Sequence, residues 1–323
     1  MLSAATRPRV SPRRVGQWRN FSGLFVIALC LGSCASQIPA EQINNFSLGA
    51  TSVANQTRNS YQVVQDEYLK AQTYRIIADY DRQGFQPALL KPFLPAEALQ
   101  VRIDVLQGLS AYAQGLASMA SDSQIKQFDA ETQKLGQQLI SLDKEKPIKG
   151  TGISDDEMAA FATAVDAMGR MFIEYKRKEA LKQVIKSHDD DVQKICHLFS
   201  REIGGSSPAD GVPPRGLRNQ LWNEYTQVLT NYDWFVGKNK ARLSPTEEFA
   251  AISQLASMLE QQATADALLA ATSGALDQLA KTHSNLSEAF ETQNGGLNAM
   301  IAQLRADAKN IEDFYSGLTS AQK

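Results

Sequence analysis

The 323-residue chain has few of the residues and motifs on which most enzymes and metal sites depend. It has no P-loop, no G-x-G-x-x-G, no H-E-x-x-H, no EF-hand loop and no G-x-S-x-G nucleophile motif. Its histidines and cysteines number three each: His188, His197, His283, Cys30, Cys34 and Cys196. We therefore predict no enzyme activity, no catalytic residues, no cofactor and no metal site.

The chain also has no apolar run long enough to cross a membrane. The longest candidate, residues 21–32, spans about 12 residues, whereas a spanning helix needs about 20. Residues 34–323 carry 28 basic and 35 acidic residues, a net charge of −7. This acidic balance, without a basic stripe, indicates no binding of nucleic acid.

Proline is absent from residues 148–207 and from every position after 245. Between the prolines, apolar residues recur at three- and four-residue intervals, and no run alternates as a strand would. Because the connections are short, neighbouring helices should be antiparallel. We predict an all-α fold, an elongated antiparallel helical bundle with long coiled-coil-like helices.

The N-terminus has the layout of a secretory signal peptide. Five arginines lie within residues 1–20 without any acidic residue, and the apolar run 21–32 follows. The run ends at Leu31-Gly32-Ser33-Cys34. An aliphatic residue, two small residues and a cysteine resemble the lipobox of bacterial lipoproteins, and this resemblance covers residues 1–34 only.

The resemblance implies that the Cys34 thiol receives a diacylglyceryl group and that cleavage occurs between Ser33 and Cys34. A fatty acid such as palmitate then acylates the new amino group. Ala35, where inner-membrane lipoproteins of enterobacteria carry Asp, resembles the sorting pattern for the outer membrane. The alternatives are an ordinary signal peptide, an uncleaved anchor and, because of Arg13-Arg14, twin-arginine export.

We expect three parts: a cleaved signal peptide over 1–33, a polar linker over 34–48 and an all-helical domain over 49–323. Within that domain, residues 204–214 should form a flexible loop. Capping boxes at Ser121, Ser154 and Ser244 predict helices that begin near 122, 155 and 245. The apolar patterns predict helices over 50–83, 96–120, 122–143, 155–203 and 215–240.

The last segment has a seven-residue repeat typical of coiled-coil packing. Counted from Leu276, its seam falls on Leu279, His283, Leu286, Phe290, Gln293, Leu297, Met300, Leu304, Asp307, Ile311, Phe314 and Leu318. Asn294-Gly295-Gly296 interrupts the repeat, and two glycines inside a helix cost about 2 kcal/mol relative to alanine. A break or kink there is favoured over a continuous helix.

The polar residues near the histidines have plain structural interpretations. Residues 187–191, Ser-His-Asp-Asp-Asp, should form a solvated helix surface, because adjacent residues on a helix point to different sides. Cys196, the only cysteine after position 34, should be buried. His283 lies in the apolar seam, either as a packed residue that sets helix register or as a proton switch.

Residues 221–235 concentrate aromatic side chains. Trp222, Tyr225, Tyr232 and Phe235 are spaced as one buried face, and Trp234 departs from it. Core packing and a contact surface both remain open here, so the segment supplies the candidate contact residues Trp222, Tyr225 and Trp234.

The sequence thus favours a non-enzymatic, periplasm-facing lipoprotein of the bacterial cell envelope. We expect it to be held in the outer membrane by lipidated Cys34 and to act as a helical scaffold or adaptor for a protein partner. The alternative is an envelope ligand-binding protein with a pocket near residues 222–235.

Overall fold

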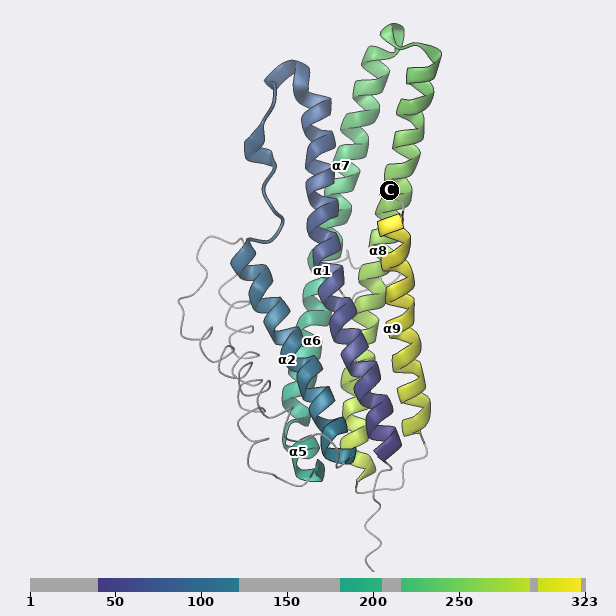
Figure 1. Ribbon diagram of the computed structural model, residues 1–323. Helices are drawn as coiled ribbons and strands as arrows, with labels where there is room; N and C mark the ends of the chain where they lie inside the picture. The colour runs from purple at the N-terminus through teal and green to yellow at the C-terminus, as the bar shows by residue number, and fades with distance from the viewer. Residues whose placement is uncertain (1–39, 122–180, 205–215, 291–295, 321–323) are drawn as a thin grey trace, which may run out of the picture. The chain divides into compact units, whose positions relative to one another are not determined.

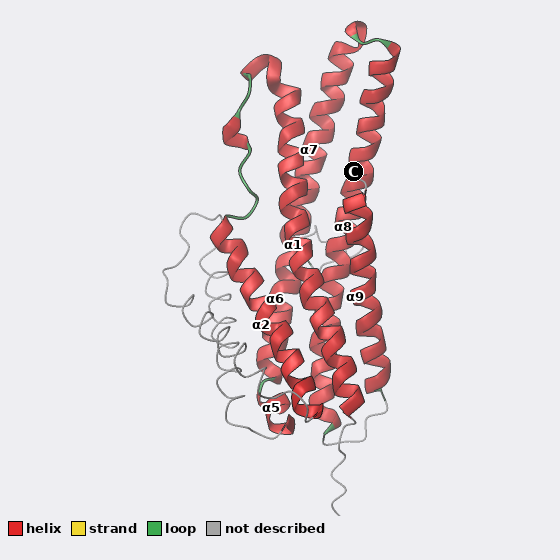
Figure 2. Ribbon diagram, in the orientation of Figure 1, coloured by secondary structure: helices red, strands yellow, loops and turns green. Residues whose placement is uncertain are grey.

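The computed structural model describes residues 40–121, 181–204, 216–290 and 296–320 of the chain. These residues form seven α-helices and two short 3₁₀ turns, and no strand occurs among them (Figure 2). The helices are α1 (Ala40–Gln83), α2 (Ala96–Ser121), α5 (Leu181–Ser187), α6 (Asp189–Ile203), α7 (Gly216–Asn239), α8 (Pro245–Ala289) and α9 (Leu297–Ser320). The all-α prediction is confirmed.

Consecutive long helices pack side by side and run in opposite directions, as α1 with α2, α7 with α8 and α8 with α9 show (Figure 1). The two longest, α1 and α8, have 44 and 45 residues. At 1.5 Å per residue each is about 66 Å long. No helix among the described residues is long and apolar enough to span a bilayer.

The start of α8 confirms the capping box predicted at Ser244. The Ser244 hydroxyl accepts a hydrogen bond from the Glu247 amide, and the Glu247 carboxylate accepts one from the Ser244 amide at 2.8 Å. Pro245 occupies the first helical position, where a missing N–H costs nothing. The other two capping boxes predict helices over residues that the structure does not describe.

The apolar core joins all seven described helices, with α5 and α7 contributing a few residues each. Its largest fully buried side chains include Phe46, Tyr61, Leu109 and Phe199. A second, smaller cluster, Ala71, Val228 and Met258, joins α1, α7 and α8 nearer to the end of α1. The predicted ends of α1 and α2 and the predicted span of α7 agree with these helices.

The predicted linker over 34–48 was wrong from residue 40 onward, because α1 begins at Ala40. Ile43 and Phe46 are only 1% exposed and belong to the core. They extend the buried face of α1 by two turns, where Gly49 allows α9 to approach so closely that a Cβ there would lie 3.0 Å from Leu304. Packing against α9 therefore stabilises the helical conformation of residues 40–48, which are polar in sequence apart from a few apolar positions.

The predicted long segment 155–203 is interrupted at His188, and its first part lies outside the described residues. α5 ends at Ser187 and α6 begins at Asp189. α6 then ends at Gly204, whose φ of 108° lies in the left-handed region that favours glycine. Gly204 is thus the first residue of the loop predicted over 204–214, whose other residues are not described.

The break predicted near Gly295-Gly296 is confirmed, because α8 ends at Ala289 and α9 begins at Leu297 and runs back along it (Figure 1). Four positions of the repeat counted from Leu276 are buried in α9 as predicted, namely Leu297, Leu304, Ile311 and Leu318, but the positions between them are not. Met300, Asp307 and Phe314, which the repeat also placed in the seam, are only partly buried or exposed. The buried positions are Leu297, Ile301, Leu304, Ala308, Ile311 and Leu318. The intermediate seam positions are therefore Ile301 and Ala308, one residue later than predicted.

A buried ion pair connects α1, α2 and α6. The Arg102 guanidinium donates to a Glu202 carboxylate oxygen at 2.7 Å through Nε, and the Tyr61 hydroxyl donates to the other oxygen. Both charged side chains are at most 10% exposed. Burial and the Glu202 carboxylate raise the pKa of Tyr61. Its hydroxyl therefore stays protonated and donates the hydrogen bond to Glu202.

We expect Arg102→Leu to lower the free energy of unfolding by about 3–5 kcal/mol, because it leaves the Glu202 carboxylate buried without its cation. Arg82→Leu is the matched control. Arg82 pairs with Asp79 on the surface and is 60% exposed, so its loss should cost at most about 1 kcal/mol. Urea unfolding followed by circular dichroism measures both, and equal losses would contradict the prediction.

Candidate functional site

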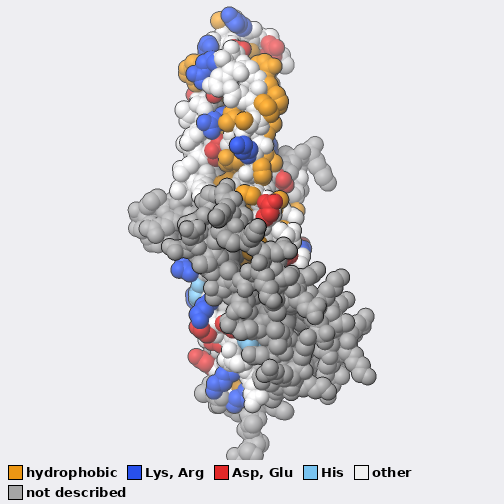
Figure 3. Space-filling view, turned by 90° about the vertical axis from the view of Figure 1, so that its left-hand side faces the viewer, with side chains coloured by type: hydrophobic (Ala, Val, Ile, Leu, Met, Phe, Trp, Pro, Cys, Tyr) orange, Lys and Arg blue, Asp and Glu red, His pale blue; other side chains and the backbone are white. Residues whose placement is uncertain are grey.

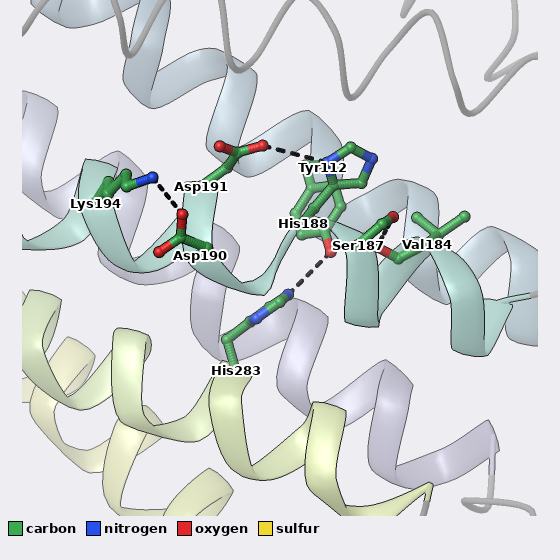
Figure 4. A network of polar contacts seen from close by, with 8 residues as sticks. All are labelled: Tyr112, Val184, Ser187, His188, Asp190, Asp191, Lys194 and His283. Atoms are coloured by element: carbon green, nitrogen blue, oxygen red, sulfur yellow. Dashed lines mark hydrogen bonds and ion pairs between the residues drawn. The ribbon is translucent and has the colours of Figure 1, made fainter.

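A buried histidine network lies where α2, α6 and α8 meet (Figure 4). His283 of α8 is fully buried, and its Nε2 lies 2.9 Å from the hydroxyl of Tyr112 on α2. Its Nδ1 lies 2.8 Å from a carboxylate oxygen of Asp189, the first residue of α6. Three helices therefore meet at one imidazole ring.

A second histidine lies beside the first. His188, between α5 and α6, is 3% exposed, and its ring lies edge-on to Tyr112 with centroids 6.4 Å apart. Its Nδ1 is 3.5 Å from a carboxylate oxygen of Asp191 (Figure 4). The expected solvated surface over 187–191 was thus wrong for His188, although Asp190 is exposed and pairs with Lys194.

The helix break explains why His188 and Asp189 both reach the interior. On one continuous helix adjacent residues would point about 100° apart. Here His188 lies between the end of α5 at Ser187 and the start of α6 at Asp189, and its φ of −107° and ψ of 7° depart from helical values. His188 is therefore buried, and the partly exposed Asp189, whose side chain is 21% exposed, still reaches His283.

The proton positions in this network follow from its hydrogen-bonding groups. An ionised Asp189 can only accept, so His283 Nδ1 carries the proton between them. Nε2 of neutral His283 then accepts from the Tyr112 hydroxyl, and in the imidazolium it donates to the same oxygen. The Tyr112 hydroxyl and the Asp189 carboxylate therefore satisfy both ring nitrogens of His283.

Burial shapes the acid–base properties of the partners. Burial, together with the Asp189 and Asp191 carboxylates, raises the pKa of Tyr112, which stays a neutral phenol. Partial burial acts to raise the pKa of Asp189, but hydrogen bonds and charge from His283 and a hydrogen bond from Gln193 outweigh it. The pKa of Asp189 is therefore lowered.

This arrangement fixes three helices relative to one another, but its geometry does not suit nucleophilic catalysis. A neutral, buried phenol is a poor nucleophile, and His283 has no exposed surface to offer a substrate. Within the described part of the chain, no three His, Cys, Asp or Glu side chains are arranged to hold a metal ion.

Of the three aromatic candidates, Trp222 and Tyr225 line one depression and Trp234 does not. Tyr225 is buried, and its hydroxyl donates a hydrogen bond to the Glu67 carboxylate of α1. Burial and that carboxylate raise the pKa of Tyr225. Trp222, expected on the same buried face, is 42% exposed. Trp234 is 53% exposed, with the Lys238 ammonium 5.1 Å from its ring centroid.

A shallow depression lies between Trp222, Tyr225 and Gln262, and its floor includes Leu221 and Leu269. Arg218 and Asp266 close one side through two hydrogen bonds of 2.7 Å. The empty volume, open solvent included, is about 160 Å³. Pockets for small molecules typically have roughly 300–1,000 Å³.

The remaining candidates are either buried or outside the described residues. Cys196 is fully buried as predicted, and burial raises the pKa of its thiol. His197 lies half-exposed with its Nδ1 3.2 Å from Asp277. Ser33 and Cys34, the predicted cleavage and lipidation residues, precede the described part of the chain.

The sequence interpretation missed an exposed apolar stripe on α8. Phe249, Ile252 and Leu259 are 73%, 54% and 56% exposed. Ala256 lies between Ile252 and Leu259, Ala263 follows Leu259, and both alanines are exposed. We call these five residues the α8 stripe. Their three- and four-residue spacing was readable, but the repeat was counted only from Leu276, and spacing alone does not tell a buried face from an exposed one.

Comparison with known proteins identified no relative of this chain. No family model, no curated protein and no solved structure matches this chain. The roles of Cys34, His283 and the α8 stripe must therefore be inferred from their own chemistry.

We expect His283→Leu to lower the free energy of unfolding by about 3 kcal/mol. The change leaves the Tyr112 hydroxyl and the Asp189 carboxylate without this partner, at roughly 1–3 kcal/mol for each buried group. His197→Leu, a change at a half-exposed histidine, should cost less than about 0.5 kcal/mol. Urea unfolding at pH 7 compares the two, and the prediction fails if both cost the same.

The lowered pKa of Asp189 predicts a pH dependence. Because the folded value lies below the unfolded value of roughly 3.9, the carboxylate stabilises the fold above about pH 4. This contribution disappears as the pH falls through the folded value. In urea unfolding from pH 7 to pH 2.5, the deficit of Asp189→Asn against wild type should be constant above pH ~5 and shrink below pH ~4. Asp190→Asn, at an exposed residue, should show no such trend.

Proposed function

We propose that this chain is a bacterial lipoprotein in which acylated Cys34 anchors a helical scaffold or adaptor domain at the periplasmic face of the outer membrane. The observation that carries the proposal is Leu31-Gly32-Ser33-Cys34 after a basic and then an apolar segment. One acyl chain gives only marginal membrane binding, whereas two or more anchor a protein stably. A triacylated Cys34 needs no spanning helix.

The start of α1 supports a domain held close to its membrane. Ala40 follows Cys34 by six residues, a distance of at most about 21 Å of extended chain. α1 continues for about 66 Å from there. In this proposal the end of the bundle that contains Ala40 is membrane-proximal, and the end that contains Gln83 and Pro245 projects into the periplasm (Figure 1).

The surface of the projecting end supports a protein-binding role. Tyr80 and Phe85 near the end of α1, Trp234 of α7 and Phe249 of α8 are each more than half exposed. Figure 3 shows apolar side chains among charged ones on the upper part of one face. Exposed aromatic and apolar groups of this kind are typical of contact surfaces between proteins.

Ligand binding near residues 222–235 is the second candidate, and exposed Trp222 beside the Arg218–Asp266 pair favours it. The volume of the depression argues against it, since about 160 Å³ is small for a ligand of ordinary size. The exposed apolar side chains favour the scaffold or adaptor role.

The anchor is tested by Cys34→Ala in the full chain, with Cys30→Ala as the matched control. Cys30 lies four residues earlier, within the expected signal peptide. We expect Cys34→Ala to move most of the protein out of the membrane fraction and Cys30→Ala to leave it there. Intact-mass spectrometry of wild type should show the loss of residues 1–33 and the added acyl groups. An unmodified residue 34 or a retained leader would contradict the proposal.

A further inference from the structure

The α8 stripe faces away from the rest of the bundle. On the opposite side of the same turns, Met258 is fully buried and Gln254 donates to the Tyr74 hydroxyl of α1 at 2.7 Å. α9 covers only the later turns of α8, because it ends partway along that helix (Figure 1). An outward surface of about four helical turns is thus left open on α8.

The spacing of the stripe fits another helix. Steps of three, four, three and four residues repeat every seven, which is the period of a coiled-coil seam. A helix that lies on a membrane has a broader apolar face and basic residues beside it. Here the neighbours of the stripe include Glu248 and Glu260, and α8 has no Lys or Arg before Lys281. Glu248 pairs with Lys240 at 3.0 Å, so exposed Glu260 is the carboxylate that an anionic lipid surface would repel.

We propose that the α8 stripe packs against the α8 stripe of a second copy of this chain, in parallel and in register. Each stripe residue then faces its own counterpart, which gives five apolar layers. Ala256 and Ala263 let the two helices approach closely. Glu248 faces the second copy's Ser253, and Glu260 faces the second copy's Leu255, so no like charges meet across the seam.

The parallel direction rests on the proposed function. Two copies anchored through Cys34 in one membrane have their Ala40 ends on the same side, so their α8 helices run the same way. An antiparallel pair would place the two Ala40 ends at opposite ends of the dimer. Co-anchoring also raises the effective concentration of one copy near the other.

The contact between the two α8 stripes is small, so the pairing depends on the raised effective concentration that co-anchoring provides. Five side chains per copy fall short of the roughly 800 Å² per partner that stable complexes bury. The pairing should therefore be weak between dilute, lipid-free copies and strong between copies anchored in one membrane.

Cysteine cross-linking of the full chain in cell envelopes tests the proposal. Facing seam positions bring Cα atoms within the roughly 4.4–6.8 Å that a disulfide requires. Ala256→Cys and Ala263→Cys should each give disulfide-linked dimers under mild oxidation, at least fivefold above Ala250→Cys. Ala250 is also exposed but points about 100° away from Phe249 on the same helix. The buried Cys196 thiol does not contribute.

A second change keeps the test specific. In the Ala263→Cys chain, Ile252→Glu should reduce dimers to the level of Ala250→Cys, because it places two carboxylates in one layer. Leu48→Glu, at a residue of α1 that is 61% exposed, should leave them unchanged.

Three cross-linking results would each overturn the pairing: no excess of dimers at 256 and 263, an excess at only one of these positions, or equal dimers at 250. Binding of the Cys34→Ala chain to phosphatidylglycerol vesicles that Ile252→Glu abolishes would assign the stripe to lipid and also overturn it. Failure of the anchor is distinguishable. Unlipidated protein that still cross-links at 256 and 263 contradicts the lipid anchor and supports pairing of the α8 stripes. Lipidated protein without cross-links supports the anchor and contradicts the pairing.

Discussion

Buried polar side chains that must find partners on other helices are the constraint on which the rest of this bundle depends. Apolar faces alone would let two long helices slide by a turn with little loss of contact area. A buried hydroxyl, imidazole or carboxylate without a partner costs roughly 1–3 kcal/mol, so each such group fixes one register. On α8, Thr272 meets Ser60 and Ser273 meets Ser200, both at 2.9 Å, and His283 meets Tyr112 and Asp189.

These polar pairs are spread along the bundle, and each joins different helices. Tyr225 donates to Glu67 between α7 and α1, and Arg102 pairs with Glu202 between α2 and α6. The apolar core supplies most of the favourable free energy of folding, and the polar pairs select one arrangement of the helices from several of similar apolar contact. This division of roles explains why long α1 and α8 keep a defined alignment over many turns.

Features set by neighbouring residues could be predicted from the sequence, and features set by distant ones could not. The capping box at Ser244 involves residues three apart, and it correctly located the start of α8. The helical start at Ala40 depends on α9, which is some 260 residues away in the chain, so Ile43 and Phe46 among polar neighbours were taken for a linker. Among the described residues, Gly84 and Gly204 follow the ends of α1 and α6 and Pro245 begins α8, because glycine and proline act on their own backbone.

The histidine network shows the same limit at a single site. The seam position of His283 indicated a buried polar residue, yet neither Tyr112 nor Asp189 could be named as its partner without the fold. The break at His188 had no proline or glycine to mark it, and the α8 stripe and the buried seam of α9 have similar spacing but opposite exposure. Periodicity therefore predicts a face, and only the neighbouring helices decide whether that face is buried.

The buried Cys196 thiol can report how often the core of this domain opens. It is the only thiol after position 34, and it is fully buried in the main core. The domain therefore folds without any internal disulfide, and oxidants or reductants leave its covalent framework unchanged. A thiol reagent reaches this sulfur only when the helices around it separate. The labelling rate of Cys196 in the wild-type protein therefore reports how often the core opens.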